Sequence, residues 1–305
     1  DNGGEIVFRA VGPSFPVIVI ERNSPQEVVA ALSILTGRIE MPPKWAIGYH
    51  QCRYSYEPDT RVMEIANGFR SRDIPCDVIW HDIDYMNKYM CFTFDPMKFS
   101  NPTRHNADLH RLGFRTVWMI DPGIGAEKAK HPAGGYSVYE SGTAIDAWVK
   151  RADGTTYQGE VWPGWCVFPD YTRRETRTWW AGLYKGFMAT GIDGVWNDMN
   201  EPAVFNVQTK TMPEDNVHRA DAELGGPGPH ARFHNVYGML MVKSTREGIM
   251  AANPDKRPFV LSRAGYIGSH RYAASWTGDN KADWEHLADS VPMALNLSLS
   301  GQPFV

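Results

Sequence analysis

Acidic and other hydrogen-bonding side chains follow most of the short apolar runs of this sequence. The stretch GVWNDMNEP, residues 194–202, is the densest example, because Asp198 and Glu201 come close behind an apolar run. Similar side chains end the other runs, and they are His50, Asp82, Asp84, Asp121, Arg263 and Asp279. Two carboxyl groups that share one cavity can act as nucleophile or base and as proton donor. The pattern therefore predicts carboxylate chemistry if these run ends meet.

Three other interpretations compete with a carboxylate pair. A single Asp behind a strand most often caps the next helix, but several such acids together with Arg263 favour a site. Clustered carboxylates also bind Mg²⁺ or Zn²⁺, yet HExxH is absent and His81 stands alone in its run. A Ser or Cys nucleophile is disfavoured because the sequence has no GxSxG elbow. The sequence therefore predicts two carboxylates acting together, as glycoside hydrolysis requires, with no metal and no cofactor.

Composition limits the possible partners. The 305 residues carry a net charge of −4 without a run of Lys or Arg, which argues against nucleic acid as a partner. No stretch of 18 apolar residues is present, so we expect no membrane span. The four cysteines form no CxxC pair and indicate free thiols. The 11 Trp suit a ligand with apolar faces, such as a sugar ring, as well as an ordinary core.

The elements that must bring the acids together alternate along the chain. The predicted strands are residues 45–51, 76–85, 114–121, 192–198, 258–263, 273–279 and 302–305. The predicted helices among them are residues 60–72, 173–190, 234–250 and 282–299. Before all of these, Ser24, Pro25 and Glu27 predict the start of a helix that ends near Gly37.

Alternating strands and helices predict an α/β fold with a parallel sheet covered by helices. Six or seven such units without a dinucleotide or phosphate-loop signature favour a (β/α)8 TIM barrel over an open, doubly wound sheet. In a barrel the strand C-termini meet at one mouth, so acids far apart in sequence share one cavity. Residues 125–172 and 203–233 are rich in Gly, Pro and polar residues, and we expect them to be insertions on the rim.

With its residues in this order, the chain resembles glycoside hydrolase family 31, the family of the lysosomal, intestinal and glucosidase-II-type α-glucosidases. The resemblance runs from about residue 25 to the end. It rests on seven motifs, which are WAIGYHQCRYSY, DVIWHDIDYM, VWMIDPGI, VWPG, GVWNDMNEP, LSRAGYIGSHRY and WTGDN. Any one of them is weak alone, but seven in sequence at strand ends are specific.

The resemblance implies a division into domains. Residues 1–22 would be the end of an N-terminal β-sandwich domain, and residues 23–305 an incomplete (β/α)8 catalytic barrel, truncated before strand eight. The family's strand-eight region, with an active-site histidine, and its C-terminal β-domains would then follow the last residue. On this basis we expect residues 1–305 alone to be poorly active or unstable. Compartment and oligomeric state are left undetermined.

The resemblance also implies roles for individual residues. Asp198 matches the catalytic nucleophile and Asp279 the general acid/base, while Asp82 and Arg263 match residues that bind the sugar at the nonreducing end. The positions that match the lining of the sugar pocket are Ile83, Ile124, Trp162, Trp196, Met199 and Trp276. Glu201 is expected to support Asp198. Because Asp279 must start protonated, we expect burial and the nearby negative Asp198 to raise its pKa.

The function implied by the resemblance is that of a retaining, exo-acting α-glucosidase, which releases terminal glucose from α-glucoside oligosaccharides. The NDMNEP stretch favours glucose over an α-xyloside or a sulfosugar. Two activities that use the same glycosyl intermediate stay open, those of an α-glucosyl transferase and of an α-glucan lyase. A non-catalytic carbohydrate-binding subunit is the alternative from a different class, and it would require the loss of Asp198 or Asp279.

Overall fold

The central element of the fold is a curled parallel sheet. The computed structural model describes residue 4, residues 7–8 and residues 15–305, and in these residues six strands pair in the order β1-β2-β3-β7-β10-β11. Their bounds are β1 His50–Gln51, β2 Val78–His81, β3 Arg115–Ile120, β7 Gly194–Asn197, β10 Val260–Ser262 and β11 Ala274–Ser275. Every neighbouring pair is parallel, and sheet order follows chain order. The predicted α/β TIM-barrel fold is thereby confirmed, as a curled part of a barrel.

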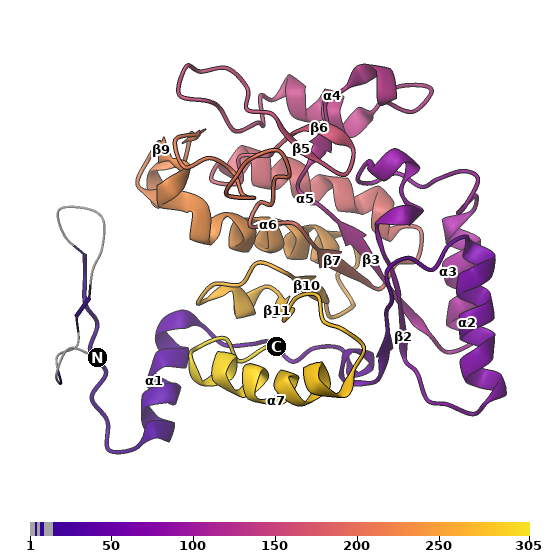
Figure 1. Ribbon diagram of the computed structural model, residues 1–305, viewed down its shortest axis with the longest axis horizontal. Helices are drawn as coiled ribbons and strands as arrows, with labels where there is room; N and C mark the ends of the chain where they lie inside the picture. Colours follow the sequence, from indigo (N-terminus) through magenta and orange to yellow (C-terminus); the bar gives the residue numbers. More distant parts are fainter. Residues whose placement is uncertain (1–3, 5–6, 9–14) are drawn as a thin grey trace.

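Helices lie around the outside of the sheet (Figure 1). Their bounds are α1 Pro25–Thr36, α2 Asp59–Ser71, α3 Pro102–Arg111, α4 Ser137–Ala144, α5 Arg174–Met188, α6 His230–Ala252 and α7 Trp284–Leu299. Short 3₁₀ helices cover Lys44–Ile47, Ile83–Tyr85, Asn87–Tyr89, Lys128–Lys130, Ala222–Leu224 and Ser269–Arg271. The start of α1 is as predicted, because the Ser24 hydroxyl accepts a hydrogen bond from the Glu27 N–H. All predicted helices are present.

Two predicted strands differ from the structure. The start of 45–51 folds as the 3₁₀ helix Lys44–Ile47, which Pro43 precedes, so only His50 and Gln51 pair with β2. Residues 302–305, all within the described part, form no strand. Their backbone shares one hydrogen bond with β11, from the Ser275 N–H to the Phe304 carbonyl at 2.7 Å, and one bond does not make a ladder.

Helix α3 was missed in the sequence because its apolar pattern is weak. Its buried residues are His105, Asn106 and Leu109, so polar side chains form most of its inner face. The capping signal was present, since the Asn101 side chain accepts a hydrogen bond from the Arg104 N–H and a proline follows it. Inside, His81 stacks on Trp118 at 3.9 Å and bonds His105 at 2.9 Å, so polar atoms replace the expected apolar stripe.

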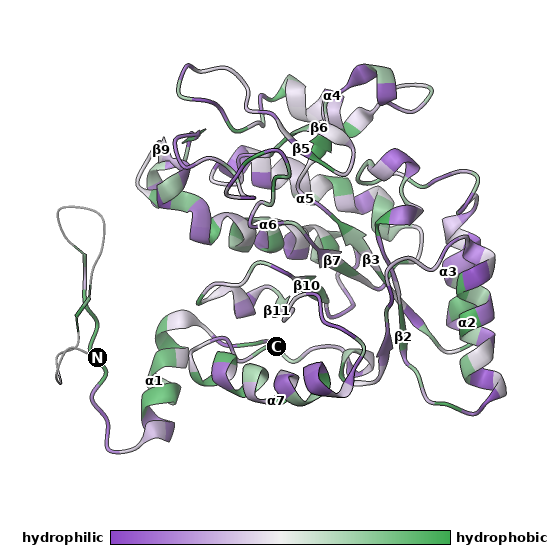
Figure 2. Ribbon diagram, in the orientation of Figure 1, coloured by the Kyte–Doolittle hydropathy of each residue, from purple (hydrophilic) through white to green (hydrophobic). Residues whose placement is uncertain are grey.

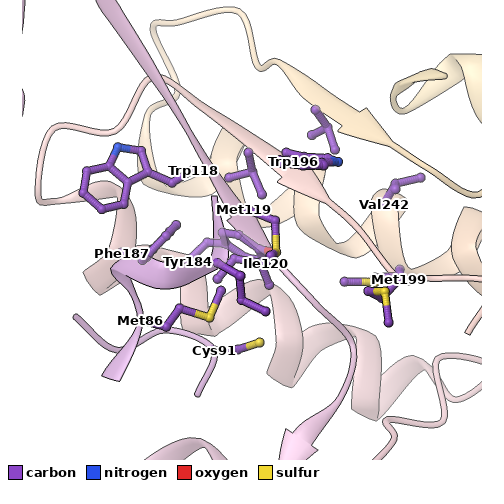
Figure 3. Close-up of a cluster of buried hydrophobic side chains, with 14 of the residues drawn as sticks. Met86, Cys91, Trp118, Met119, Ile120, Tyr184, Phe187, Trp196, Met199 and Val242 are labelled. Atoms are coloured by element: carbon purple, nitrogen blue, oxygen red, sulfur yellow. The ribbon is translucent and has the colours of Figure 1, made fainter. Parts of the chain in front are cut away.

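The core lies between the sheet and its helices. Strands β2 and β7 are buried at every residue, as is β3 after Arg115, which accounts for their nearly continuous apolar sequences. Hydrophobic colours accordingly run along β3 in Figure 2. Figure 3 shows how Met119 and Ile120 of β3 gather with Tyr184 and Phe187 of α5 and with Trp196 of β7.

The two predicted insertions carry small elements of their own. Residues 124–167 contain α4 and an antiparallel sheet of β4 Ile124–Gly125, β6 Gly164–Val167 and β5 Gly159–Val161. Residues 203–233 contain the pair β8 Val217–His218 and β9 Gly228–Pro229. The backbones of Lys150 and Val217 bond the two insertions together, at 2.7 and 3.1 Å. Half of the proposed end of a β-sandwich, residues 1–22, lies outside the described residues, and residues 15–22 form neither helix nor strand.

A row of buried side chains fixes the second insertion to helix α6. The Asp170 carboxylate contacts His218 Nδ1 at 2.8 Å, and His218 Nε2 contacts His230 Nδ1 at 2.9 Å. His230 Nε2 in turn contacts His234 Nδ1 at 3.1 Å. Burial, with the neighbouring imidazoles, lowers the pKa of His230 to about 3, so this ring is neutral.

No helix in the described residues is long and apolar enough to cross a membrane.

The absence of a side chain at Gly238 lets α6 approach the loops behind β7 and β10. A Cβ at this position would stand 2.6 Å from the Ala264 Cβ and 2.7 Å from the Asn200 carbonyl oxygen. We expect Gly238→Ala to destabilise the protein by about 1–3 kcal/mol through overpacking. The measurement is the melting temperature of the full-length protein by calorimetry.

A matched control is Gly186→Ala in α5. Among the described residues nothing lies within 4 Å of a Cβ built there. Alanine is a better helix former than glycine, so this control should stabilise by about 0.5–1 kcal/mol. Equal shifts of melting temperature for the two substitutions would contradict the close approach at Gly238.

Candidate active site

A cavity of about 600 Å³ opens where the parallel strands end. Four side chains predicted for the site line it, and they are Asp82, Trp196, Trp276 and Asp279. They follow or belong to β2, β7 and β11, which are distant in sequence. The convergence of strand ends, which the fold class predicts, thus brings together acids and indole rings at one cavity.

Asp198 directly follows β7 and is held by one hydrogen bond and one ion pair. Its Oδ1 accepts a hydrogen bond from the Met199 N–H at 2.8 Å and lies 3.2 Å from the Arg263 Nε. Met199 has a φ of 55°, an unfavourable conformation for a residue with a side chain, and strain of this kind is typical of functional sites. The Asp198 side chain is 13% exposed, so it is largely enclosed, and it is not among the residues that line the cavity with Asp82 and Asp279.

The surroundings of Asp198 shift its ionisation. Burial raises the pKa of its carboxyl to about 6, and the charges of Glu201 and Asp279 act in the same direction. The Arg263 guanidinium and the Met199 N–H oppose this rise in pKa. Near neutral pH the group is therefore mainly ionised, and it is more basic than an ordinary aspartate.

Arg263 links the acids behind β7. Its Nε and Nη2 contact the two carboxylate oxygens of Glu201 at 2.8 and 2.9 Å, which is a bidentate ion pair. The same Nε lies 3.2 Å from the Asp198 Oδ1, so Glu201 and Asp198 share one guanidinium group. This arrangement agrees with a supporting position for Glu201 and places Arg263 as the counter-ion of both acids.

Two asparagines fix the segment around Asp198. The Asn197 amide donates to the Ile120 carbonyl of β3 at 3.3 Å. The Asn200 amide donates to the Ser262 hydroxyl at 2.9 Å, and its carbonyl oxygen accepts from the Ala264 N–H at 2.9 Å. Both asparagines are completely buried. The strand end that carries Asp198 is thereby bonded to β3 on one side and to the end of β10 on the other.

Asp82 both caps a turn and faces the cavity. Its Oδ1 accepts a hydrogen bond from the Ile83 N–H at 2.6 Å, as a helix cap does. Burial raises its pKa to about 6, together with the charges of Asp198, Asp84 and Asp279, while the bond from Ile83 opposes the rise. Asp82 therefore caps a turn and also lines the cavity.

Asp279 differs from the expectation in one respect. It lies in the loop after β11 and lines the cavity, but its side chain is exposed, so the expected burial is wrong. The reason is its position beyond the strand, where solvent reaches the loop. Its charge still contributes to the raised pKa of Asp82 and Asp198.

Three indole rings form an edge-to-face row at the cavity. Trp80 and Trp196 have ring centroids 5.8 Å apart, and Trp196 and Trp276 have centroids 5.0 Å apart at 89°. Within the described part of the chain, the buried Trp196 Nε1 has no hydrogen-bond partner. Aromatic faces pack on the apolar side of sugar rings, so this row suits a saccharide.

Four predicted pocket residues lie elsewhere in this structure. Ile83, Ile124 and Met199 are buried in the core, at 1%, 0% and 6% exposure. Trp162 is 37% exposed and lies between Tyr89 and Phe205, with ring centroids 5.7 and 5.8 Å away. Trp162 is therefore partly exposed and is not among the residues that line the cavity.

The sequence reasoning missed the segment after β1. Cys52, Arg53 and Tyr54 all line the cavity. Cys52 is exposed on the cavity wall, and partial desolvation there, with the charges of Asp82 and Asp279, raises the pKa of its thiol to about 12. The available signal was the HQCRYSY motif, whose polar residues stand directly behind a strand. Among the described residues, no group of three or more His, Cys, Asp or Glu is placed to hold a metal ion.

Known proteins share this fold and these motifs. The chain is 46% identical over 300 residues to "Alpha-glucosidase 2" of Bacillus thermoamyloliquefaciens, a match that covers 98% of this chain and 37% of that protein. It is 38% identical over 302 residues to "Neutral alpha-glucosidase AB" of Mus musculus, covering 98% of this chain and 30% of that one. The chain thus spans about a third of these relatives' length.

A solved structure and a family model agree with these relatives. The crystal structure of a family 31 alpha-glucosidase from Bacteroides thetaiotaomicron superposes with a TM-score of 0.82 at 53% identity, over 96% of this chain and 46% of that one. Residues 39–305 match the model of the glycosyl hydrolases family 31 TIM-barrel domain. With the parallel strands and the acids at their ends already placed, these matches show that the chain belongs to glycosyl hydrolase family 31.

Proposed function

We propose that the protein is a retaining, exo-acting α-glucosidase that releases terminal glucose from α-glucoside oligosaccharides. The observation that supports this most directly is the Asp198 carboxylate, which a hydrogen bond from Met199 and an ion pair with Arg263 orient and whose charge affects the pKa of Asp82. The relatives named as α-glucosidases support the substrate class.

In the proposed reaction Asp198 attacks the anomeric carbon C1 of the terminal glucose. A bond forms between an Asp198 oxygen and C1, the bond from C1 to the glycosidic oxygen breaks, and that oxygen takes the proton of Asp279. Water then attacks C1 and gives a proton to the Asp279 carboxylate, and the Asp198 carboxylate leaves. Retention requires the two carboxyl groups to lie roughly 5–5.5 Å apart.

The remaining residues hold the sugar and the charges. The carboxyl of Asp82 accepts hydrogen bonds from sugar hydroxyls, and the indole row packs against the ring. Arg263 keeps Asp198 ionised and fixes its orientation. The carboxylate oxygen is then held close to C1 of the bound sugar, in a geometry ready for attack.

Covalent trapping tests the proposal. The full-length protein is treated with 5-fluoro-α-glucosyl fluoride, digested and analysed by mass spectrometry. We expect the glucosyl label on the peptide that carries Asp198. A label on any other peptide, or steady turnover with inversion at C1, would contradict the mechanism. Product analysis with maltose separates free glucose from elongated oligosaccharides and from an unsaturated sugar, the products of the two alternative activities.

The pH dependence of the activity follows from the pKa of Asp198. The nucleophile must be ionised, and burial raises its pKa to about 6. We therefore expect kcat/KM to rise as the pH is raised through about 6, and to be low at more acidic pH. The measurement is kcat/KM for 4-nitrophenyl α-glucoside from about pH 4 to about pH 8. An acid limb at the ordinary Asp value, about 4, would contradict the shift.

Glu201→Gln should move this acid limb. The charge of Glu201 raises the pKa of Asp198, so its removal lowers the pH at which activity appears. The substitution also removes one side of the bidentate pair with Arg263, and we expect kcat/KM to fall about 10- to 100-fold through misalignment. Glu247→Gln, in an exposed pair with Lys243, is the control and should change neither quantity.

A further inference from the structure

Asp121 is a buried carboxyl group that the proposed mechanism does not use. Its side chain is 3% exposed, and among the described residues its Oδ1 has no hydrogen-bond partner. A negative charge on a buried carboxylate with a partnerless oxygen is unfavourable, and such a group favours its protonated form. A neutral carboxylic acid is therefore the expected form of Asp121.

The register of the sheet places Asp121 beside Asp198. Ile120 of β3 pairs with Asn197 of β7, and the two acids are the residues directly after the ends of these parallel strands. Neighbouring strands lie about 4.8 Å apart, and residues at equivalent positions project to the same side. The two carboxyl groups thus start from adjacent points of the same sheet.

The charges around this pair permit one negative charge rather than two. Burial raises the pKa of Asp121 well above its usual range, and the charge of Asp198 acts in the same direction, against the opposing charge of Arg263. The Arg263 guanidinium is already engaged, with both oxygens of Glu201 and with Asp198. Asp198 has a hydrogen-bond donor and a cation to stabilise a charge, whereas Asp121 is enclosed without a hydrogen-bond partner at Oδ1 among the described residues.

We propose that Asp121 is a positioning residue, which holds a proton so that Asp198 alone carries the negative charge of the adjacent pair. The inference rests on the proposed function, because the role concerns the reaction of Asp198. A negative charge on the adjacent Asp121 would repel the charge on Asp198. It would hold Asp198 in its protonated, unreactive form up to a higher pH. The proton on Asp121 prevents this, and the polar group fills the space beside the nucleophile.

Infrared spectroscopy of the full-length protein without substrate tests the shared proton. At about pH 8 an exposed carboxyl is ionised, so a carbonyl band of a protonated carboxylic acid reports a buried one. We expect this band in the natural protein and its loss in Asp121→Asn. In Asp198→Asn the neighbouring charge is gone, so the band should disappear at a pH lower by about 1 unit or more. An absent band, or a band that Asp198→Asn leaves unmoved, overturns the inference.

Kinetics provide an independent measurement. If Asp121 is neutral, Asp121→Asn keeps kcat within about threefold and leaves the acid limb of the kcat/KM profile in place. Asp121→Leu, which lacks the polar group, lowers kcat by a larger factor than it changes KM. A charged Asp121 predicts instead that Asp121→Asn lowers the acid limb by about 1 unit or more, which would refute the proposal. The infrared measurement does not depend on enzyme activity, and covalent trapping tests the role of Asp198 separately. A failure of the Asp121 proposal is therefore distinguishable from a failure of the proposed function.

Discussion

Asp198→Gly is expected to lower kcat by about 10⁴-fold or more, because a group that forms the covalent intermediate has no substitute in the site. The cavity left by the side chain can admit a small anion, so added azide should restore part of the turnover with an activated substrate. Azide then attacks C1 directly, from the side that Asp198 occupied. The product from an α-glucoside is the β-glucosyl azide, identified by NMR.

The control for Asp198→Gly is Asp255→Asn, a substitution at an exposed turn that should leave kcat unchanged. A melting temperature close to that of the natural protein shows that the glycine variant is folded. Residual activity above about one part in a hundred, without azide, would argue that another residue is the nucleophile, since removal of a nucleophile leaves far less.

Asp279→Ala is expected to show a different loss, which depends on the leaving group. General acid catalysis contributes about 10²–10⁴-fold, so hydrolysis of maltose should fall by this factor. Release of fluoride from α-glucosyl fluoride needs no proton, so formation of the glucosyl-enzyme should be almost unaffected. The measurement is the pre-steady-state burst of fluoride, compared with steady-state turnover.

Azide separates the two acids further. In Asp279→Ala the intermediate on Asp198 still forms, and azide then replaces the missing base step, so the expected product is the α-glucosyl azide. The anomers from the two variants are therefore opposite. The same anomer from both variants would contradict the assignment of nucleophile and acid/base, whatever the size of the rate changes.

The parallel sheet was predictable because its signal is local and repeated. Each strand is a short apolar run with a polar end, and the barrel geometry brings those ends together, so Asp82 and Asp279 could be placed at one cavity before any coordinates. Placing these acids at the cavity required no knowledge of side-chain packing. Their positions follow from strand order and from the direction in which the strands run.

Other parts of the site depend on contacts that a sequence does not encode locally. The exposure of Asp279 is set by the course of the loop after β11. The bidentate pair of Glu201 and Arg263 joins two loops that are 62 residues apart. Helix α3 packs polar residues inward, where Asn106 bonds Thr116 at 2.8 Å, so hydrophobic periodicity could not find it.

The row of Asp170, His218, His230 and His234 has a consequence for its protons. When His218 is neutral, the carboxylate accepts from His218 Nδ1–H, and each following imidazole must then donate from its own Nδ1. When His218 takes up a proton, it donates from both nitrogens, and His230 and His234 must each accept at Nδ1. The row therefore has two self-consistent tautomeric states, and one proton at His218 reverses the donors as far as the first turns of α6.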